Sequence, residues 1–194
     1  MFRWTTIAIL ALTAVVTPEH GSTAVRVAAA APVSLHPSIT FVGGSADQRR
    51  TVLDAADRFA AAHLPLPDLE VRIRDGKDSC GGDMGRFVST PTPTIDLCFD
   101  REFLALHELA HAWERFNVTD ATRAEFVVFS LADAWTGDEI PHGHRGVERA
   151  ADSIAFGLLS TPLAGSASCD RMLVGFELLT GEAPLRAGPP CERQ

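Results

Sequence analysis

The 194-residue chain is 46% hydrophobic and 22% charged. This gives enough apolar sequence for one domain with a buried core, and too little length for two domains of ordinary size. The formal net charge is −8, and the sequence shows no cluster of basic residues. Because nucleic-acid-binding proteins usually carry a basic patch, the composition argues against a nucleic-acid partner.

The N-terminal residues have the pattern of a secretory signal. Arg3 precedes an uncharged apolar run at residues 5–16, which is shorter than the roughly 20 residues that a membrane-spanning helix needs. Small residues follow, and cleavage after Ala24 or as late as residue 31 fits the small-x-small rule. The alternative is an anchor that is never cleaved.

These features predict the domain organisation and the compartment. We expect a signal peptide at residues 1–24, a flexible lead-in rich in Ala, Val and Pro at 25–37, and one domain at 38–194. No second apolar segment reaches spanning length. We therefore expect a secreted or extracytoplasmic protein that is not stably inserted in a membrane after cleavage.

The four cysteines form an even set in a chain that we expect to be exported. They are Cys80, Cys98, Cys169 and Cys191. Four cysteines allow three pairings, and sequence cannot choose among them, although local closure favours Cys80–Cys98 and Cys169–Cys191. The chain contains no CxxC spacing, so the cysteines do not indicate a zinc knuckle. Four buried thiols are the alternative, which an oxidising compartment disfavours.

The first half of the domain predicts one helix and several short strands. Residues 38–44 suggest a strand that ends in a glycine turn, and Ser45 with Gln48 forms the pattern of a capping box for a helix that ends near His63. A proline-rich stretch stops that helix. Strands are expected at 69–74, 86–90 and 94–100, and the first and last of these alternate apolar with polar residues. We expect them to form a small antiparallel sheet.

The second half predicts four helices, so the expected fold class is α+β. Their ranges are 101–116 with Asp100 as its N-terminal cap, 118–135 capped by Thr119 or Asp120, 147–160, and 168–181 closed by Gly181. In the first of them, a core-facing stripe recurs at three and four residues: Leu106, Leu109, Trp113 and Phe116.

The helix at 101–116 carries the motif H-E-x-x-H. His107 and His111 are four residues apart, so both rings lie on one face and can hold one metal ion between them. Glu108 lies beside that face, where a general base for a metal-activated water belongs. The alternative is a pair of helix histidines that only cap or pack.

A later helix offers the third ligand that a hydrolytic zinc site requires. Glu148 and Asp152 are four residues apart, and small residues around them, Ala150, Ala151 and Ala155, suggest close packing against another helix. In the functional interpretation Glu148 binds the metal and Asp152 accepts a hydrogen bond from a ligating histidine. The alternative is a solvated acidic face.

The pair of motifs "HELAH" and "ERAAD" resembles the gluzincins, zinc metallopeptidases with HExxH on one helix and ExxxD on a later one. The resemblance covers about residues 94–160. It implies one Zn²⁺ ion held by His107, His111 and Glu148, with Glu108 as general base and Asp152 as the partner of His107. The metzincin pattern fits less well, because Glu114 and Asn117 stand where it needs a glycine and a third histidine.

The chain also departs from well-studied gluzincins. It lacks their large flanking domains and has no tyrosine, whereas several of them use a tyrosine to steady the tetrahedral intermediate. That role falls to His142, His144 or Arg145 in the loop before Glu148, or to no residue. The alternative for these loop residues is simple solvation.

The sequence therefore predicts a small secreted zinc metallopeptidase that hydrolyses peptide bonds in peptide or protein substrates with a zinc-activated water. We expect the strand at 94–100 to be an edge strand that can pair with an extended peptide, or else to be purely structural. One alternative is a metal-binding domain without efficient turnover, acting as an exported binding or regulatory protein. Another is an exported interaction domain with no metal, in which His107, His111 and Glu148 lie far apart.

Overall fold

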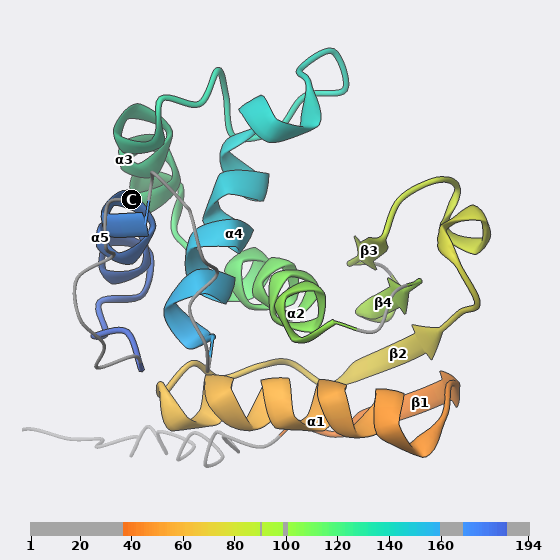
Figure 1. Cartoon of the computed structure of the whole chain (residues 1–194). Helices are drawn as coiled ribbons and strands as arrows, with labels where there is room; N and C mark the ends of the chain where they lie inside the picture. The colour runs from red at the N-terminus through yellow and green to blue at the C-terminus, as the bar shows by residue number, and fades with distance from the viewer. Residues whose placement is uncertain (1–36, 90, 99–100, 160–168, 186–194) are drawn as a thin grey trace, which may run out of the picture. The chain divides into compact units, whose positions relative to one another are not determined.

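The computed structural model describes residues 37–185 except residues 90, 99–100 and 160–168. The chain divides after Ala31, and every described residue belongs to the unit Pro32–Gln194. The described part contains a four-stranded sheet and five α-helices, which confirms the predicted α+β class (Figure 1). The expected signal peptide at 1–24 and nearly all of the lead-in lie outside the described residues, so both stay predictions.

The fold begins with a strand, a helix and a second strand. Strand β1 (Ile39–Gly43) pairs in parallel with β2 (Leu69–Ile73), and α1 (Ala46–Ala61) connects them. The predicted capping box is confirmed, because the Ser45 side chain accepts from the Gln48 N–H and the Gln48 side chain accepts from the Ser45 N–H. Helix α1 buries one apolar face in the core, consisting of Val52, Ala55, Ala56 and Phe59.

The sheet is mixed, so the prediction of an antiparallel sheet is wrong. Its order is β1-β2-β4-β3, and only β3 (Gly85–Val88) and β4 (Thr94–Leu97) pair antiparallel. A helix between β1 and β2 returns the chain to the end where it started, and this makes the two strands parallel. Strand β4 lies between β2 and β3. It is therefore an inner strand, whereas β3 and β1 are the two edge strands.

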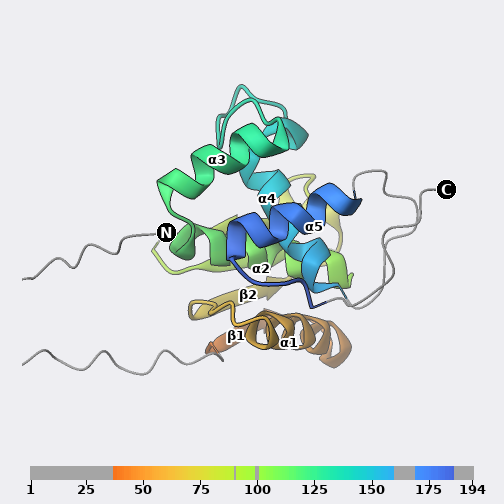
Figure 2. The same ribbon diagram turned by 90° about the vertical axis from the view of Figure 1, so that its left-hand side faces the viewer.

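Four helices complete the described part. They are α2 (Glu102–Asn117), α3 (Asp120–Ser130), α4 (Gly146–Leu158) and α5 (Cys169–Thr180). Helix α2 packs against β3 and β4 on one side and against α4 on the other, while α1 contacts it as well (Figure 1). Helix α5 contacts both α4 and α3, and Figure 2 shows these three helices together.

Two details of the predicted helices are wrong, and a third concerns a residue outside the described part. Helix α3 ends at Ser130 and not near residue 135, because Leu131 adopts a left-handed backbone with φ 57°. Arg101 occupies the N-cap position of α2 without a side-chain cap, and the expected cap Asp100 lies outside the described residues. Phe116 is 54% exposed, because it falls in the last turn of α2, beyond the core.

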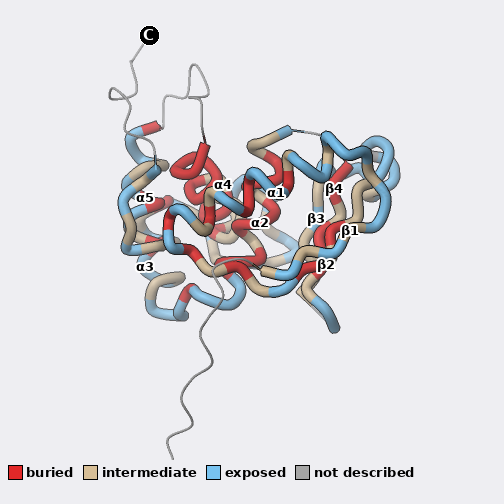
Figure 3. The backbone as a smooth tube through the Cα atoms, turned by 90° about the horizontal axis from the view of Figure 1, so that it is seen from below, coloured by how far each residue is buried: buried red, intermediate tan, exposed pale blue. Residues whose placement is uncertain are grey.

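The core is concentrated where α2 and α4 meet. Figure 3 shows buried backbone along both helices and more exposed positions along α3. Leu106, Leu109 and Trp113 of α2 are buried as predicted. The small residues of α4 are fully buried, as the expectation of close helix packing requires: Ala150, Ala151 and Ala155 are 0% exposed, as is Ala110 of α2. The α4 helix is therefore closely packed along the positions of these small side chains.

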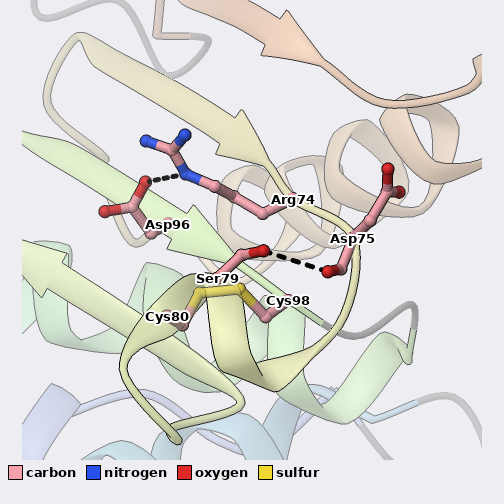
Figure 4. The surroundings of a disulfide bond; sticks show 6 residues. All are labelled: Arg74, Asp75, Ser79, Cys80, Asp96 and Cys98. Atoms are coloured by element: carbon pink, nitrogen blue, oxygen red, sulfur yellow. Dashed lines mark hydrogen bonds and ion pairs between the residues drawn. A yellow bond between two sulfur atoms is a disulfide. The ribbon is translucent and has the colours of Figure 1, made fainter.

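One predicted disulfide is confirmed. Cys80, in the short 3₁₀ turn Lys77–Cys80, is bonded to Cys98, which follows β4 (Figure 4). Cys191 lies outside the described residues, so the Cys169–Cys191 pair stays a prediction. A disulfide is consistent with an extracytoplasmic location. Among the helices of the described ranges, none has both the length and the apolarity needed to cross a bilayer.

Candidate metal centre

Helix α2 brings the two histidines of the HExxH motif together. His107 and His111 are separated by one helical turn, and their Nε2 atoms are 3.1 Å apart. The ring centroids are 4.7 Å apart and the rings are nearly perpendicular, with an interplanar angle of 88°. Both rings therefore present Nε2 to one point beside the helix.

Helix α4 adds a carboxylate at the same point. Glu148 Oε2 lies 3.4 Å from His107 Nε2 and 3.3 Å from His111 Nε2. One ligand atom from each of the three residues lies within 4.8 Å of the other two, so the group can hold a metal ion. The hypothesis of an interaction domain with no metal, in which these three residues lie far apart, is therefore wrong.

Each imidazole also contacts a carboxylate of its own through Nδ1, the ring nitrogen that faces away from the metal-ligand position. The Nδ1 atom of His107 is 2.9 Å from Asp152 Oδ1, and the Nδ1 atom of His111 is 2.7 Å from Glu114 Oε1. A carboxylate at Nδ1 keeps the proton on that nitrogen and leaves Nε2 free to act as a ligand. The expected pairing of Asp152 with His107 is therefore present.

Glu114 is a site residue that the sequence interpretation missed. Sequence analysis noted it only as a mismatch to the metzincin pattern, yet its side chain is 3% exposed and contacts His111 directly. The signal was available, because a residue three positions after His111 shares its helix face. A glutamate at that position can therefore reach the ring as a hydrogen-bond partner.

The carboxylate of Glu108 lies next to these ligands. Glu108 is 4% exposed, lines the same cavity as the histidines, and leaves its Oε2 without a hydrogen bond among the described residues. Burial raises the pKa of Glu108, while the neighbouring rings of His111 and His107 oppose that rise. A carboxylate whose pKa lies above its ordinary value is better suited to accept a proton near neutral pH.

Without an ion, protons occupy this cluster. Burial disfavours the charged imidazoles, but contacts with Asp152 and Glu148 outweigh it and raise the pKa of His107 to about 9. Burial is likewise outweighed at His111 by Glu114 and Glu148, and the pKa of His111 rises to about 10. The same rings hold the pKa of Glu148 far below its ordinary value despite its burial. A divalent ion would displace these protons, because only neutral imidazoles bind metals.

The site opens into a cavity of about 520 Å³. Helices α2 and α4 supply His107, Glu108, His111 and Glu148, β3 supplies Gly85 and Phe87, and the segment before α4 supplies Trp135, His142 and Arg145. The cavity thus contains the metal-ligand group and an edge of the sheet.

The three loop residues that sequence analysis offered as oxyanion donors lie in different places. His142, in the short 3₁₀ turn His142–His144, lines the cavity, and its Nε2 is 3.0 Å from Glu148 Oε2. Arg145 lines the cavity too, but its guanidinium donates to the carbonyls of Ile140 and Asp138. The Nδ1 of His144 is 3.2 Å from Asp133 Oδ2, and His144 is absent from the cavity lining. His142 alone of the three has its ring nitrogen at the ligand group.

Backbone hydrogen bonds fix the start of α4. After α3 ends, the N–H groups of Gly146 and Val147 donate to the carbonyls of Ala134 and Trp135. These bonds place Glu148, two residues into the helix, opposite α2. The left-handed Leu131 makes them possible, because it ends α3 and releases Trp135 from a helix.

The edge of the cavity is β3, and not the strand at 94–100 that sequence analysis expected there. The N–H of Cys98 donates to the Met84 carbonyl across the β3–β4 pair. Since hydrogen-bonded pairs alternate in an antiparallel ladder, the next bonded pair is Arg86 with Asp96. The N–H and C=O groups of Gly85 and Phe87 therefore point away from β4, toward the open edge.

Comparisons with protein-family models, with curated proteins and with solved structures found no match to this chain.

Proposed function

We propose that this protein is an exported zinc-dependent metallopeptidase. The observation that carries the proposal is the convergence of two imidazole nitrogens of α2 and one carboxylate oxygen of α4 beside a buried glutamate of the HExxH motif, although Glu148 comes 37 positions after His111 in the chain. Two imidazoles and a carboxylate, with one position left for water, are a donor set that catalytic Zn²⁺ takes in proteins.

The donor residues fit such an ion. Glu148 Oε2 is buried and has no hydrogen-bond partner among the residues that the structure describes, although imidazole nitrogens lie 3.0–3.4 Å from it. An ion would satisfy an acceptor that hydrogen bonding leaves open. His107, His111 and Glu148 would hold the ion, which when bound supplies Lewis-acid activation of water and of the peptide carbonyl.

The remaining residues perform the proton transfers of hydrolysis. Glu108 accepts a proton from the attacking water, whose oxygen forms a bond to the carbonyl carbon. The same carboxyl group then gives its proton to the leaving nitrogen as the C–N bond breaks, which yields a carboxylic acid and an amine. His142, directed into the cavity, is the residue we propose as hydrogen-bond donor to the developing oxyanion.

The substrate that suits this cavity is an extended peptide. The N–H and C=O groups of Gly85 and Phe87 point away from β4 and have no strand partner in the described ranges, so they can pair with a peptide backbone that lies along the cavity. Pairing of this kind places a peptide carbonyl near Glu108 without any demand on side-chain identity. This pairing supports a peptide or protein substrate.

The test combines metal analysis with peptide cleavage. Protein expressed for export should contain about one zinc ion per chain and cleave members of a mixed peptide library. A chelator should abolish cleavage and added Zn²⁺ should restore it. Glu108→Ala should keep its metal and lose at least about 100-fold in rate, as expected for removal of a general base.

A matched control and the contrary outcomes complete this test. Glu125→Ala, which removes an exposed acid from α3, should behave like the unchanged protein. Protein that folds correctly and takes up no zinc would refute the proposal. Protein that binds zinc and cleaves nothing would favour the alternative of a metal-binding domain without turnover.

A further inference from the structure

Gly85 lies unusually close to the carboxylate of Glu108. A Cβ atom placed on Gly85 would be 2.3 Å from Glu108 Oε1 and 2.7 Å from Glu108 Cδ. Both distances are far below any van der Waals contact. The edge strand β3 therefore accommodates this carboxylate only because residue 85 has no side chain.

The backbone conformation of Gly85 does not explain the glycine. The left-handed φ values that favour glycine occur at other positions, such as Gly81 and Gly82, and Gly85 is in an ordinary strand. An alanine would fit the strand geometry there. What demands the missing Cβ is the neighbouring glutamate.

The same residue lies at the open edge of the sheet. Gly85 presents its N–H and C=O groups away from β4, as the alternation of the β3–β4 ladder requires. On the side facing α2 it adjoins the carboxylate of a glutamate that is 4% exposed. One residue thus touches both the carboxylate and the place where an extended chain would pair.

We propose that Gly85 is a positioning residue that sets the location of the Glu108 carboxylate relative to a peptide docked on β3, an inference that rests on the proposed function. The Glu108 side chain has little room to move, because it is buried beneath the strand and next to His107 and His111. A methyl group at position 85 would force the carboxylate to another rotamer. The three metal ligands come from α2 and α4 and keep their places.

The experiment compares Gly85→Ala in two backgrounds. In the otherwise unchanged protein, Gly85→Ala should lower kcat/KM by roughly 100-fold, the effect of about a 1 Å misplacement of a reacting group, with zinc content unchanged. The loss should fall mainly on kcat. Combined with Glu108→Ala, which removes every side-chain atom that a Cβ at residue 85 would meet, Gly85→Ala should cost little beyond the residual activity of Glu108→Ala alone.

A thermal-unfolding cycle tests the same contact without any activity. Gly85→Ala should lower Tm by about 3 °C when Glu108 is present, and by much less in the Glu108→Ala background, where the obstructing carboxylate is gone. Gly143→Ala serves as control, since its Cβ would meet no atom within 4 Å.

The outcomes separate this inference from the proposed function. A chain that cleaves no peptide but shows the background-dependent Tm loss would refute the peptidase and retain the contact. Gly85→Ala with full activity, or with a Tm loss that is the same with and without the Glu108 side chain, would overturn the inference while leaving the peptidase intact.

Discussion

Two walls of the cavity are built in different ways. The helix wall consists of α2 and α4 and carries His107, His111 and Glu148 among fully buried alanines. The loop wall consists of residues 135–145, and its ring nearest the ligands, His142, is 68% exposed at the side chain. Helical spacing and tight packing fix the first wall, whereas a few backbone hydrogen bonds fix the second. We therefore expect metal binding to depend on the helix wall and turnover to depend on both.

Removal of the ligand from α4 should have the largest effect. Glu148→Ala leaves two imidazoles without a carboxylate, and metal affinity should fall by more than about 100-fold, the upper value for loss of a group that only orients a ligand. Metal content after dialysis against a competing chelator measures this loss. Glu177→Ala, an exposed acid of α5, is the control. Retention of stoichiometric metal by Glu148→Ala would remove Glu148 from the ligand set.

The two orienting carboxylates should differ from each other. Glu114→Ala and Asp152→Ala should each weaken metal binding by about 10–100-fold. The Glu114 side chain is 3% exposed and that of Asp152 is 40% exposed, so water can replace the Asp152 carboxylate more easily than that of Glu114. We expect Glu114→Ala to lower the free energy of unfolding of the metal-free protein by about 1–3 kcal/mol, and Asp152→Ala by less. Equal losses in chemical denaturation would contradict this difference.

The pH dependence of stability should reverse when metal binds. In the metal-free protein the pKa values of His107 and His111 are raised to about 9 and about 10. Groups with raised pKa values stabilise the fold below their unfolded pKa, near 6.5, and that stability is lost as pH rises towards 10. The loss should amount to roughly 3 kcal/mol, because the Nε2 atoms, 3.1 Å apart, share one proton, a pKa raised from 6.5 to about 9 spans the change, and each pKa unit corresponds to about 1.4 kcal/mol. With zinc the sign reverses, since protons compete with the ion. Denaturation at pH 6, 7.5 and 9, with chelator and with zinc, measures both slopes.

The smallest effect on metal affinity should come from the loop wall. His142→Ala removes a ring that contacts Glu148 but lies outside the ligand group. Affinity should change by less than about 3-fold, well under the loss expected for an orienting carboxylate, while kcat falls. Zinc competition with a chromophoric chelator gives the affinity. A large loss of affinity would make His142 a ligand and erase the distinction between the two walls.

Much of the helix wall could be predicted from the sequence. Spacings of four residues put His107 with His111, and Glu148 with Asp152, on single helix faces wherever the helices lie in the fold. Small residues of α4, such as Ala151, indicated close packing against another helix. Local periodicity therefore identified which atoms could meet, because a helix repeats the same geometry at every turn.

What could not be predicted depends on non-local pairing and on single backbone angles. The sheet order placed β4 inside and β3 at the edge, and no local pattern encodes which strands become neighbours. The left-handed Leu131 ended α3 early, although leucine rarely adopts that conformation. The significance of Gly85 depends on a contact with Glu108 across 23 positions of sequence, which appears only when strand and helix are packed together.

The small residues of the core also bear on the geometry of the candidate metal ligands. Ala150, Ala151 and Ala155 of α4 are inaccessible to solvent, as is Ala110 of α2, and the two helices pack against each other. A larger aliphatic side chain at one of these positions would match the core in polarity but would need space that a packed core does not have. We expect such a substitution to change the distances among His107, His111 and Glu148, although none of these alanines belongs to that group.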